Sequence, residues 1–312
     1  MEDITVVIPA HNAAKTIERA LSSIPRYVRV IVIIDGTTDD TGRLANTYSN
    51  VSVIVNDKSV GAAHARNIGL EKVSTEFVTF LDADDYIVGD LHRGMAQTLS
   101  ATYADAVFSP WGVEQGQSFQ MRGSLGALRP VVNDRTALLI AWLRGNGCLT
   151  GSVGWRTAFL RSIGGWANVR KAQDYEIGIR TIIKGARFTC SDQGCLVYVD
   201  HVDPNRISRI RSSTVIDDQI SILAQAKQFA NDCSDPKSVR KAIGVRYYLL
   251  ALSCFQEGER TIGRDLLFAA RSLGFSGHIG TPLSRLVSYI IGAEAKVTVA
   301  KKARCIKKLH RS

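Results

Sequence analysis

Three aspartates lie together in the stretch FLDADDY (80–86), where they follow the apolar run 77–81. Without partners, Asp82, Asp84 and Asp85 would repel one another, and this raises carboxyl pKa values. A divalent cation removes the repulsion, and Mg²⁺ or Mn²⁺ binds one or two carboxylates while keeping positions for water and phosphate. The stretch therefore predicts a Mn²⁺ or Mg²⁺ site that also holds a diphosphate. The alternative is that Asp84 and Asp85 cap a helix beginning near Asp90 or lie in a solvated turn.

The first hundred residues contain the elements that must position this site. Four continuous apolar runs of strand length alternate with segments that place apolar residues on one helical face. The predicted strands are 4–8, 29–34, 51–55 and 77–81, and the predicted helices are 13–24, 39 or 40 to 48, and 62–73. Strands that are apolar throughout and separated by helices indicate a mostly parallel sheet covered on both faces. We therefore predict an α/β fold with a Rossmann-type, doubly wound sheet.

Polar residues follow each predicted strand. Pro9, His11 and Asn12 follow the first strand, and Asp35 follows the second. In such a sheet the ligand binds in the crevice beyond the carboxyl ends of the strands, so we expect these side chains to meet the aspartates there. The sequence has no GxGxxG after the first strand and no GxxxxGK[ST], which disfavours a Rossmann dehydrogenase and a P-loop NTPase.

A resemblance to a known family covers about residues 4–208. The motifs IPAHN (8–12), IIDGTTDDT (33–41), GAAHARNIG (61–69) and FLDADD (80–85) resemble the nucleotide-binding half of a family 2 glycosyltransferase with the GT-A fold. The segments RTAFLRSIGGW (156–166) and QDYEIGIR (173–180) resemble the acceptor side of that family. The resemblance implies a metal-dependent, inverting transfer of a sugar from a nucleoside diphosphate sugar, with UDP favoured, to a hydroxyl of a glycan or lipid-linked acceptor.

The resemblance also implies roles for residues on the donor side. Asp35 matches the acid that hydrogen-bonds the nucleotide base, and its alternative role is that of a turn residue. Asp82 matches the first acid of a DxD motif, near the ribose or metal, and Asp84 matches the direct metal ligand. Arg66 matches a contact to a phosphate or the base, and its alternative is a solvated helix charge. Pro9, His11, Asn12 and Gly61 match the loops around the nucleotide.

On the acceptor side, Asp174 matches the general base, which takes the proton of the attacking hydroxyl. Its alternative role is that of an exposed acid at a helix N-terminus. His201 matches a residue that joins the metal shell or closes over the diphosphate, although a lone histidine is also commonly structural.

The chain departs from the family pattern at two positions. Gln173 replaces an acid before Asp174 and cannot ionise, so Asp174 must carry the proton. Ile34 replaces an acid before Asp35, and we expect Ile34 in the core and Asp35 to make the contact alone. Two other functions stay open: a nucleotidyltransferase, and a non-catalytic carbohydrate-binding protein on a transferase fold.

The charge distribution disfavours nucleic acid as a partner. The net charge is +10, but residues 296–312 contain seven Lys or Arg and no acid, and the rest of the chain has 32 basic and 29 acidic residues. A nucleic-acid-binding protein usually spreads its basic face over the folded body. The six cysteines include no CxxC pair, and no apolar run reaches the roughly 20 residues that cross a bilayer. We therefore expect a cytoplasmic protein.

The C-terminal third is predicted to be helical. Residues 215–229, 238–255 and 261–273 have apolar spacings of three and four. We expect a catalytic domain at 1–213, with a nucleotide-sugar half at 1–110 and an acceptor-side half at 111–213. A helical region at 214–312, a candidate for homodimer contacts, follows it. The stretch 283–309 has the pattern of a basic amphipathic helix that can bind an anionic membrane, here the inner face; the alternative is a solvated terminus.

Overall fold

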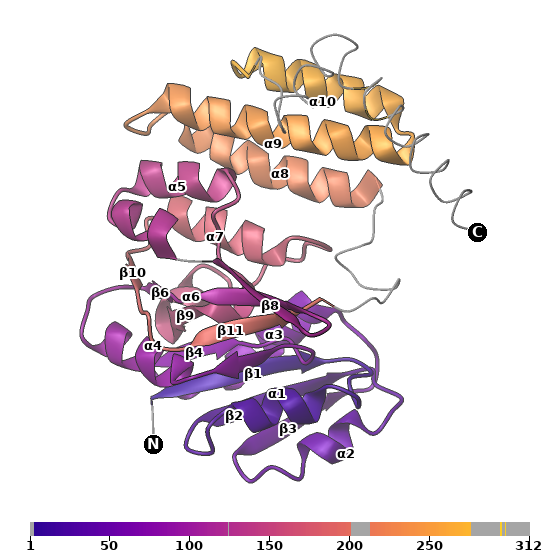
Figure 1. Ribbon diagram of the computed structural model, residues 1–312, viewed down its shortest axis with the longest axis vertical. Coiled ribbons are helices and arrows are strands. Elements are labelled where there is room, and N and C mark those ends of the chain that lie inside the picture. The colour runs from indigo at the N-terminus through magenta and orange to yellow at the C-terminus, as the bar shows by residue number, and fades with distance from the viewer. Residues whose placement is uncertain (1–2, 124, 201–212, 276–293, 295–296, 298–312) are drawn as a thin grey trace. The chain divides into compact units, whose positions relative to one another are not determined.

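The computed structural model describes residues 3–123, 125–200, 213–275, 294 and 297 (Figure 1). The chain divides into two compact units, Met1–Ile210 and Arg211–Ser312. We call them the N-terminal unit and the C-terminal unit, and each is described by itself.

The N-terminal unit is built on a seven-stranded sheet with the order β10-β6-β9-β4-β1-β2-β3. Its strands are β1 (Ile4–Ala10), β2 (Arg29–Asp35), β3 (Val51–Asn56), β4 (Phe77–Phe80), β6 (Ala106–Phe108), β9 (Val153–Arg156) and β10 (Phe188–Cys190). All neighbouring pairs are parallel except those of β9, which runs antiparallel to β4 and β6. The predicted α/β fold with a mostly parallel sheet is confirmed.

Helices cover both faces of this sheet because the strands are apolar on both sides. They are α1 (Ile17–Ser23), α2 (Thr41–Ala45), α3 (Ala62–Lys72), α4 (Leu91–Ser100), α5 (Arg135–Leu143), α6 (Thr157–Ser162) and α7 (Gln173–Ile183). Val6 and Ile8 of β1 join one core with Leu21 of α1 and Met95 of α4. Val7, between them in the strand, points to the opposite face and meets α3.

The contact between α3 and β1 requires a glycine. A Cβ atom at Gly69 would lie 2.3 Å from Cγ1 of Val7, closer than any real Cβ contact. Only a residue without a side chain lets the helix approach the strand this closely. Gly69 therefore sets the position of α3, the helix that carries Arg66.

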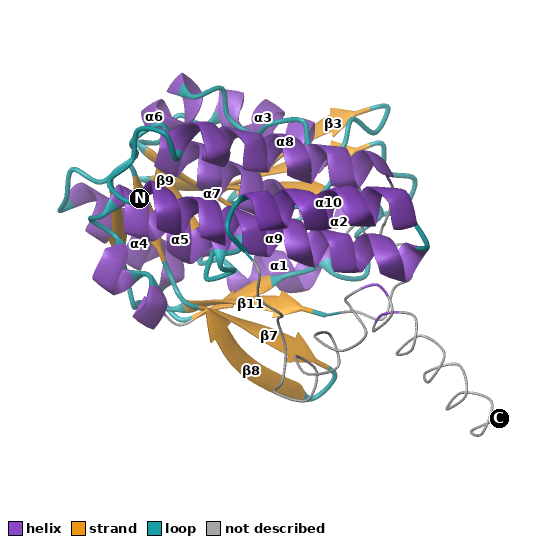
Figure 2. Cartoon of the chain, turned by 90° about the horizontal axis from the view of Figure 1, so that it is seen from above, coloured by secondary structure: helices purple, strands orange, loops and turns teal. Residues whose placement is uncertain are grey.

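A second, four-stranded sheet was not predicted from the sequence. Its order is β5-β11-β7-β8, with β5 (Tyr86–Val88), β7 (Trp111–Gln115), β8 (Ser118–Gly123) and β11 (Cys195–Val199) (Figure 2). These strands are short, and β8 is exposed along most of its length. β7 and β8 mix polar and apolar residues and β5 has only three residues, so these strands lack the apolar run that identified the central strands; β11 (CLVYV) has such a run but was not predicted.

Two predicted helices differ at their ends. The helix expected from residue 13 begins at Ile17, because residues 13–16 first form a turn in which Thr16 N–H donates to Ala13 O at 2.9 Å. The helix expected to reach residue 48 ends at Ala45.

The C-terminal unit contains three helices among its described residues: α8 (Ser213–Phe229), α9 (Pro236–Glu257) and α10 (Arg260–Ser272). The start of α9 follows from local chemistry, because the Asp235 carboxylate accepts a hydrogen bond from Ser238 N–H and Pro236 occupies the first turn. Gly258, with a φ of 93°, ends it in the left-handed conformation that glycine favours.

Candidate functional site

Asp35 ends β2 as a buried carboxylate that accepts three hydrogen bonds. It accepts hydrogen bonds from Ser59 Oγ at 2.9 Å, Val60 N at 2.7 Å and Gly61 N at 2.9 Å. Burial alone raises the pKa of the Asp35 carboxyl, but these hydrogen bonds outweigh burial and lower the pKa below its ordinary value of 3.8. Asp35 is therefore ionised at neutral pH and ties β2 to the loop that begins α3.

The loop after β1 closes over the end of β2. His11 Nδ1 lies 2.6 Å from the main-chain oxygen of Asp35. The side-chain oxygen of Asn12, a residue with a φ of 48°, accepts a hydrogen bond from Thr38 N at 3.0 Å. Pro9 lies within β1, opposite Ile33, and is a strand residue where a loop residue was expected. His11, Asn12, Asp35 and Gly61 thus lie together at the carboxyl ends of β1 and β2.

The turn between β4 and β5 carries the three aspartates, and each has a different environment. Asp85 is buried and accepts a hydrogen bond from Val199 N at 2.9 Å, so its role is structural. Asp82 is partly exposed and pairs with Arg66. Asp84 is half-buried, and its main-chain oxygen accepts a hydrogen bond from Arg19 Nη2 at 3.0 Å. The helix after this turn has Asp90 at its N-cap, so neither Asp84 nor Asp85 caps it.

Arg66 connects the two halves of the N-terminal unit. Its Nη2 donates to Asp82 Oδ1 and its Nη1 donates to Gln173 Oε1. The guanidinium carbon also lies 4.8 Å from the ring centroid of Trp166. Arg66 is only 4% exposed, so the alternative of a solvated helix charge is wrong. Its Nε is buried with no hydrogen-bond partner in the described part of the chain.

Gln173 begins α7 and fixes the geometry beside Asp174. Its side-chain nitrogen donates to Val169 O at 2.9 Å while its oxygen accepts from Arg66. Ala172, with a φ of 60°, adopts a left-handed conformation that is uncommon for a residue with a side chain. The polypeptide therefore turns sharply before α7, and the turn places Gln173 against Arg66.

Asp174 is half-buried in the first turn of α7, and one carboxylate oxygen accepts a hydrogen bond from Tyr175 N at 2.8 Å. Burial raises the pKa of the Asp174 carboxyl. The Tyr175 N–H opposes this rise, the charge of Asp82 adds to it, and Arg66 lowers the pKa to a smaller extent. A carboxylate with a raised pKa near other ionisable groups is suited to proton transfer.

A small cavity of about 10 Å³ adjoins Asp174. Three tryptophans contribute to its wall, one each from α5, β9 and the segment before α7, and they are Trp142, Trp155 and Trp166. Trp155 and Trp166 are 2% and 3% exposed, so their rings belong to the core.

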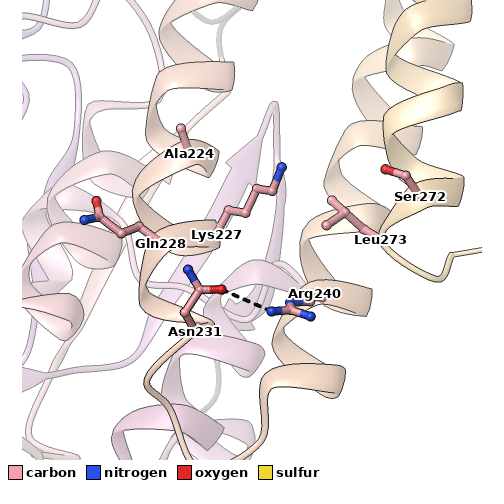
Figure 3. Close-up of a pocket in the computed structure, with 7 residues that line it drawn as sticks. All are labelled: Ala224, Lys227, Gln228, Asn231, Arg240, Ser272 and Leu273. Atoms are coloured by element: carbon pink, nitrogen blue, oxygen red, sulfur yellow. Dashed lines mark hydrogen bonds between the residues drawn. The ribbon is translucent and has the colours of Figure 1, made fainter.

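Another hollow, of about 480 Å³, lies within the C-terminal unit (Figure 3). Lys227 of α8, Asn231 in the turn after α8 and Arg240 of α9 contribute to it, and Arg240 donates a hydrogen bond to Asn231 at 3.1 Å. It contains none of the predicted site residues, and none of its lining residues is acidic.

Several predictions concern residues that the structure does not describe. His201 and the tail at 283–309 lie outside the described residues, apart from Glu294 and Val297. Within the described ranges, no group of three or more His, Cys, Asp or Glu side chains has the arrangement of a metal site. No helix of the described chain is long and apolar enough to cross a membrane.

The sequence of residues 5–162 matches the family described as glycosyl transferase family 2. This match spans half of the chain, and the chain belongs to that family. The predicted family is therefore confirmed.

Curated relatives cover part of the chain. The succinoglycan biosynthesis protein ExoU of Rhizobium meliloti (strain 1021) is 29% identical over 205 residues, which are 60% of this chain and 58% of that protein. The Escherichia coli protein named UDP-Glc:alpha-D-GlcNAc-diphosphoundecaprenol beta-1,3-glucosyltransferase WfaP is 37% identical over 94 residues, 28% of this chain and 38% of that protein. The chain thus spans less than two thirds of the length of either relative.

Solved structures share the fold. The structure of S. aureus TarS 1-349 in complex with UDP-GlcNAc has a TM-score of 0.63 at 16% identity. The matched region covers 86% of this chain and 79% of the TarS chain. The structure of GalNAc-T7 with UDP, GalNAc and Mn²⁺ has a TM-score of 0.54 at 14% identity, over 75% and 50% of the two chains. At these identities the likeness supports the fold.

The sequence analysis missed two features of the site. It did not predict that Arg66 pairs with Asp82 and Gln173, because the partners are 16 and 107 residues away. The DxD resemblance gave roles to Asp82 and Asp84 and none to Asp85, but the hydrogen bond that Asp85 accepts from Val199 N was not predicted.

Proposed function

We propose that this chain is an inverting glycosyltransferase that moves a sugar from a nucleoside diphosphate sugar to a hydroxyl group. In this reaction the acceptor oxygen attacks the anomeric carbon and forms the new C–O bond. The bond from that carbon to the diphosphate oxygen breaks, and the nucleoside diphosphate leaves with the electron pair. The acceptor proton passes to Asp174.

The observation that carries this proposal is the bridge made by Arg66. It joins Asp82, at the donor end of β4, to Gln173, the neighbour of Asp174 on α7. The donor carboxylates and the proposed base therefore lie within the reach of one side chain. A transfer reaction needs this proximity, because the diphosphate and the attacking hydroxyl meet at one carbon.

On the donor side, we assign the nucleotide to the cluster of His11, Asn12, Asp35 and Gly61. UDP is the favoured nucleotide, and the solved structures of S. aureus TarS 1-349 in complex with UDP and with UDP-GlcNAc support this choice. Arg66 is assigned to the diphosphate or the base, since it is the buried cation of the cluster. Because Asp35 already accepts three hydrogen bonds, its contact with the base uses its remaining acceptor capacity.

The residues present fit a Mn²⁺ or Mg²⁺ ion that is shared with a diphosphate. Following the DxD resemblance, Asp84 and the oxygen of Asp82 that does not face Arg66 would hold the ion, whereas Asp85 accepts its hydrogen bond from Val199 N. Such ions need only one or two protein carboxylates when phosphate and water supply the rest. The ion would stabilise the charge on the departing diphosphate. His201 stays a candidate further ligand.

The acceptor is proposed to be a glycan or a lipid-linked glycan of a cell-surface polysaccharide or glycoconjugate. The names of ExoU and WfaP support this class, the second through its diphosphoundecaprenol acceptor. A lipid-linked acceptor suits a cytoplasmic enzyme held at the inner face of the membrane by the seven basic residues of 296–312. Homodimer contacts through the C-terminal unit stay a prediction.

The membrane proposal is tested by co-sedimentation with liposomes that contain anionic lipid. The full chain should bind at low salt and be released at high salt, and a chain ending at Ala295 should not bind, because about 1 kcal/mol per basic residue is lost. Equal binding of both chains contradicts the proposal and favours an acceptor in solution.

The central experiment incubates the full chain with UDP-, GDP- and dTDP-sugars in the presence of Mn²⁺ and measures release of the nucleoside diphosphate. Release with at least one donor is expected. Metal-dependent nucleotide binding without release favours the carbohydrate-binding alternative, and pyrophosphate formation from a nucleoside triphosphate and a sugar phosphate favours a nucleotidyltransferase. The absence of both release and nucleotide binding contradicts the proposed function.

A further inference from the structure

The cavity beside Asp174 has the size of one water molecule. Its volume is about 10 Å³, close to the space that a single water requires. Besides Asp174 and the three tryptophans, its wall includes Thr150 and Gly178.

The wall carries hydrogen-bond donors that lack protein acceptors. The indole nitrogens of Trp142, Trp155 and Trp166 are all buried, and none has a partner among the described residues. The three side chains are 2%, 2% and 3% exposed, so bulk water does not solvate them. Buried donors are nearly always paired, and three residues that line one cavity each have an unpaired indole nitrogen, which favours a bound acceptor there.

The position of Trp142 connects these donors to Asp174. A Cβ atom at Gly178 would lie 2.5 Å from Trp142 Nε1, so the indole nitrogen packs directly on α7 at this glycine. Residues 174 and 178 are four apart and share one face of the helix. The Trp142 N–H and the Asp174 carboxylate therefore lie on the same side of α7, beside the cavity.

The indole donors and the single carboxylate together indicate which kind of ligand the cavity can bind. A small anion would be held by the indoles but repelled by Asp174, and a cation would be held by Asp174 but not by the indoles. Water both accepts and donates hydrogen bonds, and it needs two to four polar partners. We propose that this cavity binds one ordered water molecule, which accepts from the Trp142 indole N–H and donates to the Asp174 carboxylate.

The water has a consequence for catalysis, and this part rests on the proposed function. It holds the Asp174 carboxylate from inside the protein and stabilises its ionised form against the effect of burial. A carboxylate fixed in this way keeps its other oxygen for the acceptor hydroxyl. Trp142 is then a positioning residue that acts through the water.

The first test is a crystal structure of the full-length protein at a resolution that shows ordered water. Density is expected in the cavity, at about 2.7–3.2 Å from Trp142 Nε1 and from an oxygen of Asp174. An empty cavity, or one closed by a side chain, overturns the proposal whether or not the protein has transferase activity.

The second test compares Trp142→Phe with Trp111→Phe. Trp111 also has a buried indole nitrogen without a partner among the described residues, but it lies in β7 and is not part of the cavity wall. Trp142→Phe should lower kcat by about tenfold, the scale of one hydrogen bond to a charged group, with the donor KM unchanged. Trp111→Phe should change neither constant.

The two tests separate the inference from the proposed function. Equal kinetics of the two variants contradict the catalytic role of the water. If the wild-type protein turns over no donor, the proposed function fails, and the crystal structure still decides whether the water is bound. Thermal unfolding of both variants controls for damage from the smaller ring.

Discussion

Asp35 and Asp174 are two aspartates of the same unit with opposite environments. Asp35 accepts three hydrogen bonds that lower its pKa, whereas burial beside tryptophans raises the pKa of Asp174. Asp174 also has no ion pair with a described residue. The difference teaches that one residue type meets two environments here: Asp35 is held in its charged form and organises a loop, whereas burial disfavours the charge of Asp174, as suits the proton acceptor that we propose.

The largest effect is expected for Asp174→Asn, which tests whether Asp174 accepts the proton. Because an amide cannot accept the acceptor proton, we expect kcat to fall by about 10²- to 10⁴-fold, which is typical for removal of a general base. Nucleotide binding should stay unchanged, and calorimetry with UDP and Mn²⁺ measures it. Normal turnover of this variant would mean that another residue is the base.

The second change, Asp84→Ala, extends the comparison to a third aspartate, whose proposed role is to bind the metal ion. We expect UDP affinity in Mn²⁺ to fall by about tenfold or more, equivalent to about 1.4 kcal/mol, because the ion loses a ligand. In the presence of a chelator the variant and the wild type should bind UDP equally. If the affinity in Mn²⁺ is unchanged, Asp84 is not a metal ligand.

The third change, Asp35→Asn, should lower the free energy of unfolding, whereas Asp174→Asn should not. An amide nitrogen would face the donors Ser59, Val60 and Gly61, and a buried donor left without an acceptor costs about 1–3 kcal/mol. Urea unfolding at neutral pH should show this loss of unfolding free energy. Asp174→Asn should be neutral or stabilising in the same assay, because it removes a charge that burial disfavours. Equal losses in the two variants would remove the distinction between the sites.

The smallest expected effect is the pH dependence of these differences. Asp35 has a folded pKa below its ordinary 3.8, so its stabilising contribution is present above pH 3.8 and is lost as the pH falls through the folded pKa. Asp174 has a raised folded pKa, so its ionisation destabilises the fold progressively as the pH rises from 3.8 to that pKa. Urea unfolding of wild type and both variants between pH 3 and pH 7 measures both slopes. Slopes of the same sign would contradict the assignment.

The sequence was sufficient to predict four of the seven strands of the central sheet, because β1, β2, β3 and β4 are largely apolar runs, but it did not predict the short strands β6, β9 and β10. It also predicted that Asp35 and Asp82 lie at the same edge, since carboxyl ends of parallel strands meet there. The role of Arg66 was left open between a ligand contact and a solvated charge, because helical periodicity gives no information on a partner 107 residues away. In the small sheet, β7 and β8 mix polar and apolar residues and β5 has three residues, so none of them has a distinctive pattern, whereas the apolar run of β11 was not recognised as a strand.

The close packing at Gly69 has a consequence for how this protein can change over generations. Arg66 and Gly69 are about one helical turn apart, and Gly69 packs against Val7, a buried residue of β1 to which no role in the reaction is assigned. A larger residue at position 69 would displace α3 and move the guanidinium away from Asp82 and Gln173. Substitutions at these two core positions are therefore linked. A larger residue in place of Gly69 requires that Val7 is first replaced by a smaller one. The core of the sheet limits the evolution of the site even though none of its atoms takes part in the chemistry.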